Sequence, residues 1–542
     1  MAGVSKEDIP DMRSKVIVIG AGLAGIIAAY HACRAGAEVV IVDRGSVGLG
    51  TNSAMSNGVF AGQTSSYDKE AYIKDTIQIG RCINSESYVR LVAQEAKNGI
   101  TFLRSLGFDI IEMHAIYSLQ SQSPDVIPGV TLMQRLARIV GELNGVKIVK
   151  GFYVTSLLKH ENRVYGVSGF DALGAEVEIY ASSTVLATGG AGAVYLRNDN
   201  QKTTMGQGYR LAAEAGLILK DMEFVQFYPI VVDESNLASM ALFPPYPDEA
   251  RLINANGEDI LKKHGFDNVN QAILQKRDKL AILLFEEISS SGRVYMDYRR
   301  VPDTLWRKHP MGIISKLKKN LRAMPVAVSP AAHFFMGGAE IDDRCRTLLP
   351  GLFACGEVVW GLHGANRRGG NALTECVVTG MIAGRNAAID ADIVSPPKVV
   401  NGNHSKYMNI LKQRGRGTET LSGIRRNIRE IAWNNAGIVR SQERLKKGLK
   451  RIESIDNQIA EIVPKNVSEM KLKEDLFSAL LTTRAILVAS LGRKESRGSF
   501  FREDFKKEDD IEWRKNSALS YDNEADTFEL TYILNQTQHK TR

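Results

Sequence analysis

The stretch KVIVIGAGLAGIIAAYHACRAGAEVVIVDR, residues 15–44, decides the fold of this 542-residue chain. It opens with the apolar run KVIVIG, which is typical of a buried parallel strand. After a glycine-rich turn, AGIIAAYHACRAG has helical composition, and AEVVIVDR is a second apolar strand. Together they predict a βαβ unit, the element from which doubly wound sheets are built.

The turn between strand and helix has the spacing G-x-G-x-x-G, with glycines at 20, 22 and 25. Gly20 permits the tight turn, Gly22 lets the backbone approach a pyrophosphate, and Gly25 allows close packing of helix on strand. The helix N-terminus offers free N–H groups to the phosphates. Asp43, at the end of the second strand, would accept hydrogen bonds from ribose hydroxyls. The motif predicts a dinucleotide site, and by itself leaves NAD and FAD both open.

The composition is that of a globular chain, with 44% hydrophobic and 24% charged residues. At roughly 150 residues per domain, the length suggests about three domains. The excess of 69 Lys and Arg over 61 Asp and Glu is thin and dispersed, and it does not favour nucleic acid binding. Residues 1–13 lack the apolar core of a secretory signal, and no apolar stretch reaches the roughly 18 residues of a membrane span. We expect a cytoplasmic protein that is peripheral to a membrane complex, if at all, through its partners.

The five cysteines contain no C-x-x-C pair. Neither an iron-sulfur cluster nor a zinc site is therefore expected in this chain, and a reducing compartment is the simpler setting.

Five later segments carry a resemblance to a known family. They are TVLATGGAG (184–192), DMEFVQFYP (221–229), HFFMGGAEID (333–342), GLFACGEVVWGLHGANRRGGNAL (351–373) and RKESRGSFFREDF (493–505). In order and spacing they resemble the flavoprotein subunits of succinate dehydrogenase and fumarate reductase, the group that includes L-aspartate oxidase and the adenylylsulfate reductase α subunit. The match covers nearly the whole chain, and it favours FAD over NAD.

The resemblance implies an α/β fold, with a Rossmann-like FAD-binding domain, an inserted α+β capping domain and a C-terminal helical domain. We place the first part of the FAD-binding domain at residues 1–233 and the capping domain at 234–322. The second part of the FAD-binding domain then covers 323–395, and the helical domain covers 396–542.

The resemblance also implies catalytic residues between the FAD-binding and capping domains. Asp297-Tyr298-Arg299 resembles the family's D-x-R motif, whose arginine is the proton donor in the reductase direction. His333 and Arg367 match the histidine and arginine that grip a substrate carboxylate, and Tyr228 lies in the same region. A guanidinium suits this task because its planar fork binds a carboxylate bidentately. An arginine that acts as an acid needs a dry, positively charged neighbourhood to lower its pKa.

For the cofactor, the resemblance places Glu357 and Asn371 at the flavin and its ribityl chain, and the second glycine turn near the adenosine. The candidate cofactor contacts besides Gly20, Gly22, Gly25 and Asp43 are Arg44, Thr51, Asn52, Ser53, Asn57, Gly58, Val154, Thr188, Gly189, Gly190, Gln207, Glu357, Asn371 and Leu373. Asn52 stands where the respiratory enzymes carry the histidine bonded covalently to the flavin. Because asparagine cannot form this bond, we expect non-covalent FAD.

The chain departs from the family pattern around its substrate loop. Tyr228 replaces a histidine, and ASMALFPPYPDEARL (238–252) lacks the family's Thr-Glu and Arg-Gly-Glu segments. Whether Glu249 and Arg251 take the place of the missing groups is left open by the sequence. Tyr228 and Tyr246 suit a substrate that is bulkier or less charged than a four-carbon diacid.

These observations predict an FAD-dependent oxidoreductase that moves a hydride between FAD and a small carboxylate substrate. Electrons would pass to a separate iron-sulfur subunit. Three alternatives are a direct reaction with oxygen, a flavin electron-relay subunit without its own substrate, and adenylylsulfate-type chemistry.

Overall fold

The computed structural model describes residues 13–45, 47–394 and 420–534. The predicted βαβ unit is present as β1 (Arg13–Ile19), α1 (Leu23–Arg34) and β2 (Val39–Asp43), and β1 and β2 pair in parallel. Every side chain of β1 from Val16 to Ile19 is buried, which explains its uninterrupted apolar sequence.

The sheet built on this unit has seven strands in the order β6-β2-β1-β9-β8-β7, with β16 paired to β9. The added strands are β6 (Val146–Lys150), β7 (Tyr153–His160), β8 (Arg163–Phe170), β9 (Glu176–Leu186) and β16 (Leu352–Ala354). The pairs around β1 are parallel, whereas β7, β8 and β9 form an antiparallel meander. On one face, α1 packs against α9 (Asn371–Ile393), a helix that arrives from far later in the chain. The carboxyl ends of β1 and β2 and the start of α9 thus meet in one place.

The remaining elements complete this domain. They are η1 (Asn52–Met55), β3 (Val59–Ala61), α2 (Lys69–Ile79), α3 (Glu86–Ser105), β4 (Ile110–Glu112), β5 (Ile116–Leu119), α4 (Pro128–Gly141), η2 (Gly192–Val194), α5 (Gln207–Glu214), β10 (Leu219–Lys220), β15 (Gly338–Ala339) and η4 (Gly356–Val358).

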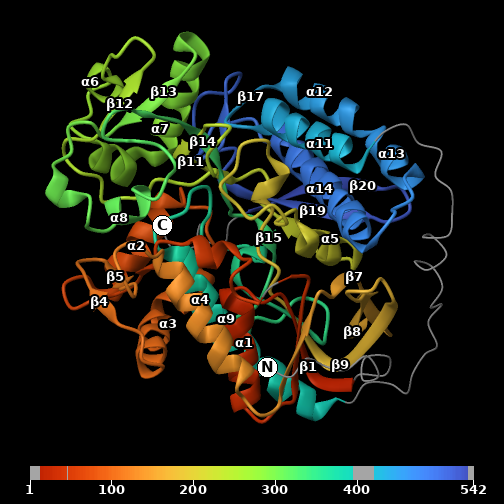
Figure 1. Ribbon diagram of the computed structural model, residues 1–542. Coiled ribbons are helices and arrows are strands. Elements are labelled where there is room, and N and C mark those ends of the chain that lie inside the picture. Colours follow the sequence, from red (N-terminus) through yellow and green to blue (C-terminus); the bar gives the residue numbers. More distant parts are fainter. Residues whose placement is uncertain (1–12, 46, 395–419, 535–542) are drawn as a thin grey trace.

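An inserted domain stands apart at the upper left of Figure 1. Its sheet has the order β11-β14-β13-β12, and its elements are β11 (Val225–Val232), β12 (Arg251–Asn254), α6 (Ile260–Lys263), α7 (Val269–Ser291), β13 (Val294–Asp297), η3 (Asp303–Leu305), α8 (Met311–Ile314) and β14 (Val326–Phe335). Its buried apolar side chains form a cluster of their own, from Tyr228 to Ala331. We call this the cap. Its core begins a few residues before, and ends a few residues after, the predicted boundaries of 234 and 322.

The C-terminal part packs its helices at the upper right of Figure 1. Its elements are α11 (Leu421–Ala436), β17 (Val439–Arg440), α12 (Gln442–Ile452), α13 (Ile455–Glu461), α14 (Val467–Gly492), β18 (Phe501–Arg502), β19 (Lys515–Asp522) and β20 (Thr527–Leu534). The hairpin β19–β20 was not anticipated by the helical prediction. It extends a four-stranded sheet through β10 and β15, so the end of the chain is tied back to the first domain.

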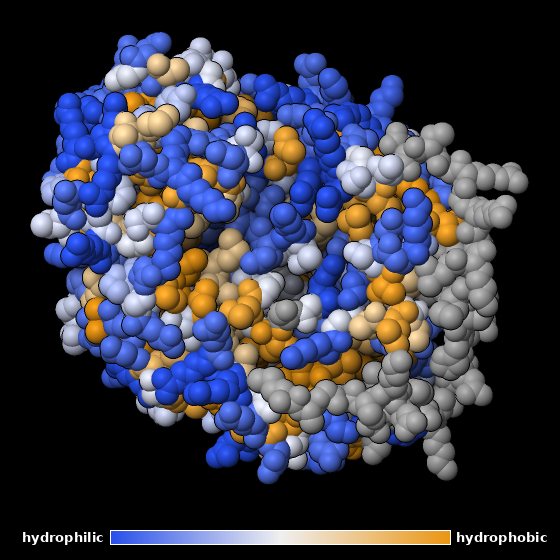
Figure 2. Space-filling view, viewed as in Figure 1, coloured by the Kyte–Doolittle hydropathy of each residue, from blue (hydrophilic) through white to orange (hydrophobic). Residues whose placement is uncertain are grey.

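By length and composition, α14 is the one helix among the described residues that could cross a membrane, although its sequence did not suggest a span. In the fold, 72% of its apolar window is buried inside the protein, so its hydrophobicity is accounted for by the core. Figure 2 shows a largely hydrophilic face on which apolar residues gather toward the middle of the view.

The segment RKESRGSFFREDF forms a buried ionic network against the segment that precedes strand β11. Arg493 donates to Glu223 at 2.7 Å and to Glu495 at 2.8 Å, and all three side chains are fully buried. Glu223 also accepts from Ser517 at 2.6 Å. The network joins the C-terminal part to the segment that leads into the cap.

Candidate active site

The glycine turn after β1 leaves no room for a side chain at Gly20 or Gly25. A Cβ on Gly20, whose φ is 101°, would lie 2.5 Å from the Ala187 carbonyl oxygen, and a Cβ on Gly25 would lie 2.0 Å from the Gly20 oxygen. Asp43 fixes the turn, because its carboxylate accepts from the Ala21 N–H at 2.9 Å and from the Gly45 N–H at 2.7 Å. Burial raises the pKa of Asp43, and these two amides oppose the shift.

A cavity of about 550 Å³ opens above this turn. It lies between the glycine turn, η1, the start of α5 and residues of α14. The candidate cofactor contacts on its lining are Gly20, Gly22, Asp43, Arg44, Thr51, Asn52, Ser53, Val154, Thr188, Gly189, Gly190, Gln207 and Glu357.

The polar groups around this cavity fit a nucleotide cofactor. Thr188 Oγ1, on the lining, is buried without a hydrogen-bond partner among the described residues, and a buried polar group of this kind is costly unless a ligand satisfies it. A Cβ on Gly190 would lie 2.2 Å from Glu357 Oε1, so the backbone here approaches the carboxylate closely. Burial raises the pKa of Glu357 to about 7, although the Phe335 N–H donates to it at 3.0 Å.

Several candidate contacts have structural tasks. Gln207 Nε2 donates to the Val154 carbonyl at 2.7 Å and so fixes the backbone of β7 at the cavity wall. The Arg44 guanidinium bonds Asp475 of α14 at 2.6 Å. Asn52 donates to Asn200 Oδ1 at 2.6 Å and accepts from the Gln201 N–H at 2.9 Å.

Five candidates lie off the cavity lining: Gly25, Asn57, Gly58, Asn371 and Leu373. Gly25 serves the close packing of α1, as expected, and Asn371 begins α9. Asn57 faces the cap, where its Oδ1 lies 2.9 Å from His309 Nε2 and its Nδ2 donates to the Pro244 carbonyl at 3.3 Å. The loop that lines the cavity at Asn52 thus contacts the cap five residues later.

A second cluster lies between the first domain and the cap. Arg367 Nε donates to Gln226 Oε1 at 3.0 Å, and Arg277 Nη1 of α7 donates to the same oxygen at 3.3 Å. Gln226 Nε2 donates in turn to the Arg367 carbonyl at 3.1 Å, which fixes the orientation of its amide. The Arg367 guanidinium also stacks on Phe334, 4.7 Å from the ring centroid.

Neither guanidinium of this cluster has an ion pair with a carboxylate in the described part of the chain. Arg367 is 7% exposed, and Arg277 Nε is enclosed without a partner from the described residues. Burial and the neighbouring Arg277 lower the pKa of Arg367 to about 9, and burial lowers the pKa of Arg277. Two partly desolvated cations thus share one amide oxygen, and no carboxylate of the described residues neutralises them. Such a pair of charges favours the binding of an anion.

His333 and Tyr228 border the same cluster. His333 Nδ1 lies 2.7 Å from Asp199 Oδ2, which fixes the ring and leaves Nε2 without a hydrogen bond to any described residue. The rings of Tyr228 and His333 are 5.4 Å apart between centroids. The Tyr228 hydroxyl lies 3.0 Å from the Tyr246 hydroxyl and donates to the Leu242 carbonyl at 3.1 Å, and burial raises its pKa to about 12.

Arg299 is not brought to this cluster. Its side chain is 45% exposed and bonds Asp297 at 2.9 Å, and Asp297 also pairs with Arg251 at 2.9 Å. Among the described residues, none of these three has a hydrogen bond or ion pair with His333, Arg367 or Gln226. The D-x-R motif is therefore an ion-pair network of strands β12 and β13.

Arg277, Gln226 and Asp199 are the residues that sequence reasoning missed. Gln226 lies inside the segment DMEFVQFYP, in which Tyr228 was the predicted site residue. Arg277 lies in a polar helical stretch, and the helix bends just before it, at Lys276 with φ −146° and ψ 43°. Only this bend and the placement of the cap reveal that Arg277 faces Arg367.

Comparison with known proteins agrees with this geometry. Residues 15–373 match the family described as FAD binding domain, and residues 425–541 match the family described as fumarate reductase flavoprotein C-term. The chain belongs to this flavoprotein family.

Relatives and solved structures of the family extend over nearly the whole chain. One subunit of the fumarate reductase (CoM/CoB) of Methanothermobacter marburgensis is 30% identical over 537 residues, which cover 93% of this chain and 96% of that protein. L-aspartate oxidase of Mesorhizobium japonicum is 29% identical, with 92% and 93% covered. A mutated FrdA of E. coli quinol fumarate reductase superposes with a TM-score of 0.86 at 25% identity, over 98% of both chains. This flavoprotein is an FAD-dependent oxidoreductase, and the cavity above Gly20 is the candidate site for its FAD.

Proposed function

We propose that this flavoprotein transfers a hydride between FAD and a small carboxylate substrate that is held between Arg367, His333 and the cap's Arg277. The observation that carries the proposal is the pair of guanidinium groups on Gln226 Oε1, at 3.0 and 3.3 Å, without a carboxylate of the described residues in ion-pair contact. A substrate carboxylate supplies the missing anion, and a guanidinium binds it bidentately.

The roles of the side chains follow from their surroundings. Arg367 and His333 bind the carboxylate, and Asp199 orients His333 by accepting from Nδ1. Arg277 delivers the proton to the substrate carbon in the reductase direction, because it belongs to the cap and its pKa is lowered by burial. This assignment replaces Arg299, which is half-exposed and tied to Asp297. Closing the cap excludes water, which strengthens each of these electrostatic contacts.

Residues of the cavity above Gly20 hold the cofactor. When bound, FAD supplies the hydride chemistry at its isoalloxazine, and the protein supplies position and polarity. Gly20, Gly22 and the N-terminus of α1 would hold the pyrophosphate, and Val154 and Gln207 line the same cavity. Asn52 is engaged with Asn200 and Gln201, so we propose that FAD is held without a covalent bond.

The pocket walls indicate which substrates fit. Tyr228 and Tyr246 occupy the side where the dicarboxylate enzymes carry a histidine, and their hydroxyls are engaged with one another and with the Leu242 carbonyl. The arginines can neutralise one anionic end of a substrate. The other end of the substrate would contact the aromatic surface of the two tyrosines. We propose an unsaturated or saturated organic acid that is bulkier or less charged than succinate.

For the electrons, we propose an iron-sulfur partner. The relative from M. marburgensis is named as one subunit of its reductase, and this chain has no cysteine motif for a cluster of its own. The electrons that the flavin exchanges with the substrate therefore need a carrier outside the chain.

The test is anaerobic turnover of the FAD-loaded protein with a panel of small organic acids, using a reduced dye in one direction and an oxidised dye in the other. Arg277→Lys and Arg277→Gln should lower kcat strongly while an inert carboxylate still perturbs the flavin spectrum, and Arg299→Gln serves as the matched control with near-normal kcat. If no acid in the panel turns over while a co-purified partner reduces the flavin reversibly, the protein is an electron relay and the proposal is wrong.

A further inference from the structure

A second cavity, larger than the one above Gly20, lies outside both sites above. It has a volume of about 1320 Å³ and borders the segments that connect the cap to the first domain, at the end of β11 and the start of β14. Loop residues 196–202, strand β13 and α11 supply its other walls. It adjoins the FAD cavity, since Gln201 and Lys202 line both.

The lining of this cavity, which we call the hinge cavity, carries excess positive charge. Five cationic side chains face two carboxylates: Arg197, Lys202, Arg293, Lys319 and Arg429 against Asp233 and Glu234. Arg197 pairs with Asp233, and Lys319 pairs with Glu234. Within the ranges that the structure describes, Lys202, Arg293 and Arg429 have no ion pair.

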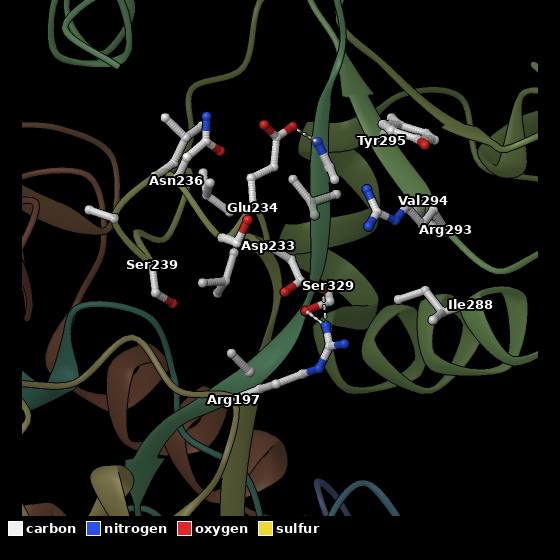
Figure 3. A pocket seen from close by; sticks show the side chains of 18 of the residues that line it. Arg197, Asp233, Glu234, Asn236, Ser239, Ile288, Arg293, Val294, Tyr295 and Ser329 are labelled. Carbon is white, nitrogen blue, oxygen red and sulfur yellow. Dashed lines mark hydrogen bonds and ion pairs between the residues drawn. The ribbon is translucent and has the colours of Figure 1, made fainter. Parts of the chain in front are cut away.

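The unpaired arginines reach the cavity from different parts of the molecule. Arg293 is exposed and precedes β13, whereas Arg429 belongs to α11 and uses only Nε, which donates to the Ala193 carbonyl at 2.8 Å. Burial and the neighbouring Arg425 lower the pKa of Arg429 to about 10, as expected for a cation that has no counterion. Figure 3 shows Arg197 and Arg293 approaching the same region, with Tyr295 beside Arg293.

We infer that the hinge cavity binds a polyvalent organic anion, whose carboxylate or phosphate groups bridge Arg293 of the cap and Arg429 of the C-terminal helices. The size of the cavity suits an organic molecule and exceeds what a single inorganic ion needs. Tyr295 and the exposed Leu196 and Met324 supply apolar contacts for its carbon skeleton. The anion would join the cap to the C-terminal helices, in a cavity where Arg197 of the first domain already donates to Ser329 of β14 at 2.7 Å.

The experiment is isothermal titration of FAD-saturated protein at low ionic strength, with citrate in one arm and pyrophosphate in the other, so that the two anion chemistries are compared directly. FAD saturation keeps pyrophosphate out of the cofactor site. We expect saturable binding of about one equivalent in at least one arm. Arg293→Gln and Arg429→Gln should each weaken binding about tenfold, the effect of losing a charge-assisted hydrogen bond.

Arg307→Gln is the matched control, since Arg307 is an exposed arginine of the cap that does not line the cavity. Its affinity should stay within about twofold of the parent, as for a distant surface substitution. Arg293 is exposed, so its variant remains informative even if Arg429→Gln, at a half-buried position of α11, fails to fold. The inference is overturned if neither anion binds, or if all three variants lose affinity equally. Because the readout is heat of binding, these outcomes are independent of whether any acid is turned over.

Discussion

Gln226 is the residue through which the two halves of the proposed substrate site meet. Its amide oxygen accepts from an arginine of the first domain and from an arginine of the cap, while its nitrogen is held by the Arg367 carbonyl and by Asn366. An amide can hold two cations side by side without neutralising them, which a carboxylate would do. The residue therefore keeps the charge of the site available for substrate.

A pH dependence of binding follows from this arrangement. The pKa of Arg367 is lowered to about 9, so the side chain is charged below that pH and loses its charge above it. The affinity of the FAD-loaded protein for the tightest carboxylate of the panel should fall as pH rises through about 9. In Arg277→Gln, a cation that lowers this pKa is gone, so the fall should move to higher pH. A Kd measured from flavin absorbance across the alkaline range checks both statements, and a pH-independent Kd contradicts them.

Asn52 gives a second prediction at this scale. Its amide is bonded to Asn200 and Gln201, and it cannot form a covalent bond to the flavin. Denaturation with acid should release all of the FAD into the supernatant, measured by absorbance of the supernatant and of the washed pellet. A yellow pellet would show a covalent flavin and remove this part of the proposal.

At the scale of elements, the bend in α7 decides where the cap's arginine points. The helix leaves regular geometry at Lys276, with φ −146° and ψ 43°, and Arg277 follows at once. The sequence of α7 mixes polar and apolar residues throughout. It contains neither a proline nor a glycine that would mark the bend. Nothing in the sequence of α7 therefore marks Arg277, whereas Asp297-Tyr298-Arg299 resembles the family's D-x-R motif, so the sequence led to Arg299.

The strands that carry the cap are clamped by one side chain. Arg197 pairs with Asp233 just after β11 and donates to Ser329 of β14 at 2.7 Å. In Arg197→Ala, the amides of residues 231–239 and 326–331 should exchange faster. The free energy of local opening there should fall by about 1 kcal/mol, since the Arg197–Asp233 pair is partly exposed. Exchange in β1 and β2 should be unchanged, and this serves as the internal control. Equal exchange in the variant and the parent would show that the contacts of Arg197 do not stabilise these strands.

At the scale of the whole molecule, a buried ionic network connects the C-terminal part to the approach of the cap. Glu223 and Arg493 are fully buried at 2.7 Å, and Ser517 adds a further hydrogen bond to Glu223. Removing one charge leaves the other in a low-dielectric environment. Glu223→Gln should reduce the free energy of unfolding by about 3 kcal/mol, the cost of breaking a buried pair.

Thermal unfolding of the FAD-loaded protein measures this effect. Asp392→Asn is the control, because its pair with Lys15 is exposed and should contribute less than about 1 kcal/mol. A loss in Glu223→Gln no larger than in Asp392→Asn would show that the network carries little stability.

The sequence predicted what local physics determines. Residues 15–44 specified the βαβ unit, since buried strands and a glycine turn have patterns of their own, and the cap and the family followed from quoted motifs. The features that the sequence did not predict depend on contacts between residues that are far apart in the chain. The hairpin β19–β20 needs β10 as its partner, the apolar α14 needs the fold to show that it is core, and Arg277 needs the cap in place before it meets Arg367.

The short loop around η1 has a consequence of its own. Asn52 and Ser53 line the cavity of the cofactor, and Asn57 grips the cap through His309 and Pro244. A single short loop thus contacts both the cofactor cavity and the cap. We expect occupation of the cofactor cavity to steady this loop and, with it, the contact that Asn57 makes with the cap.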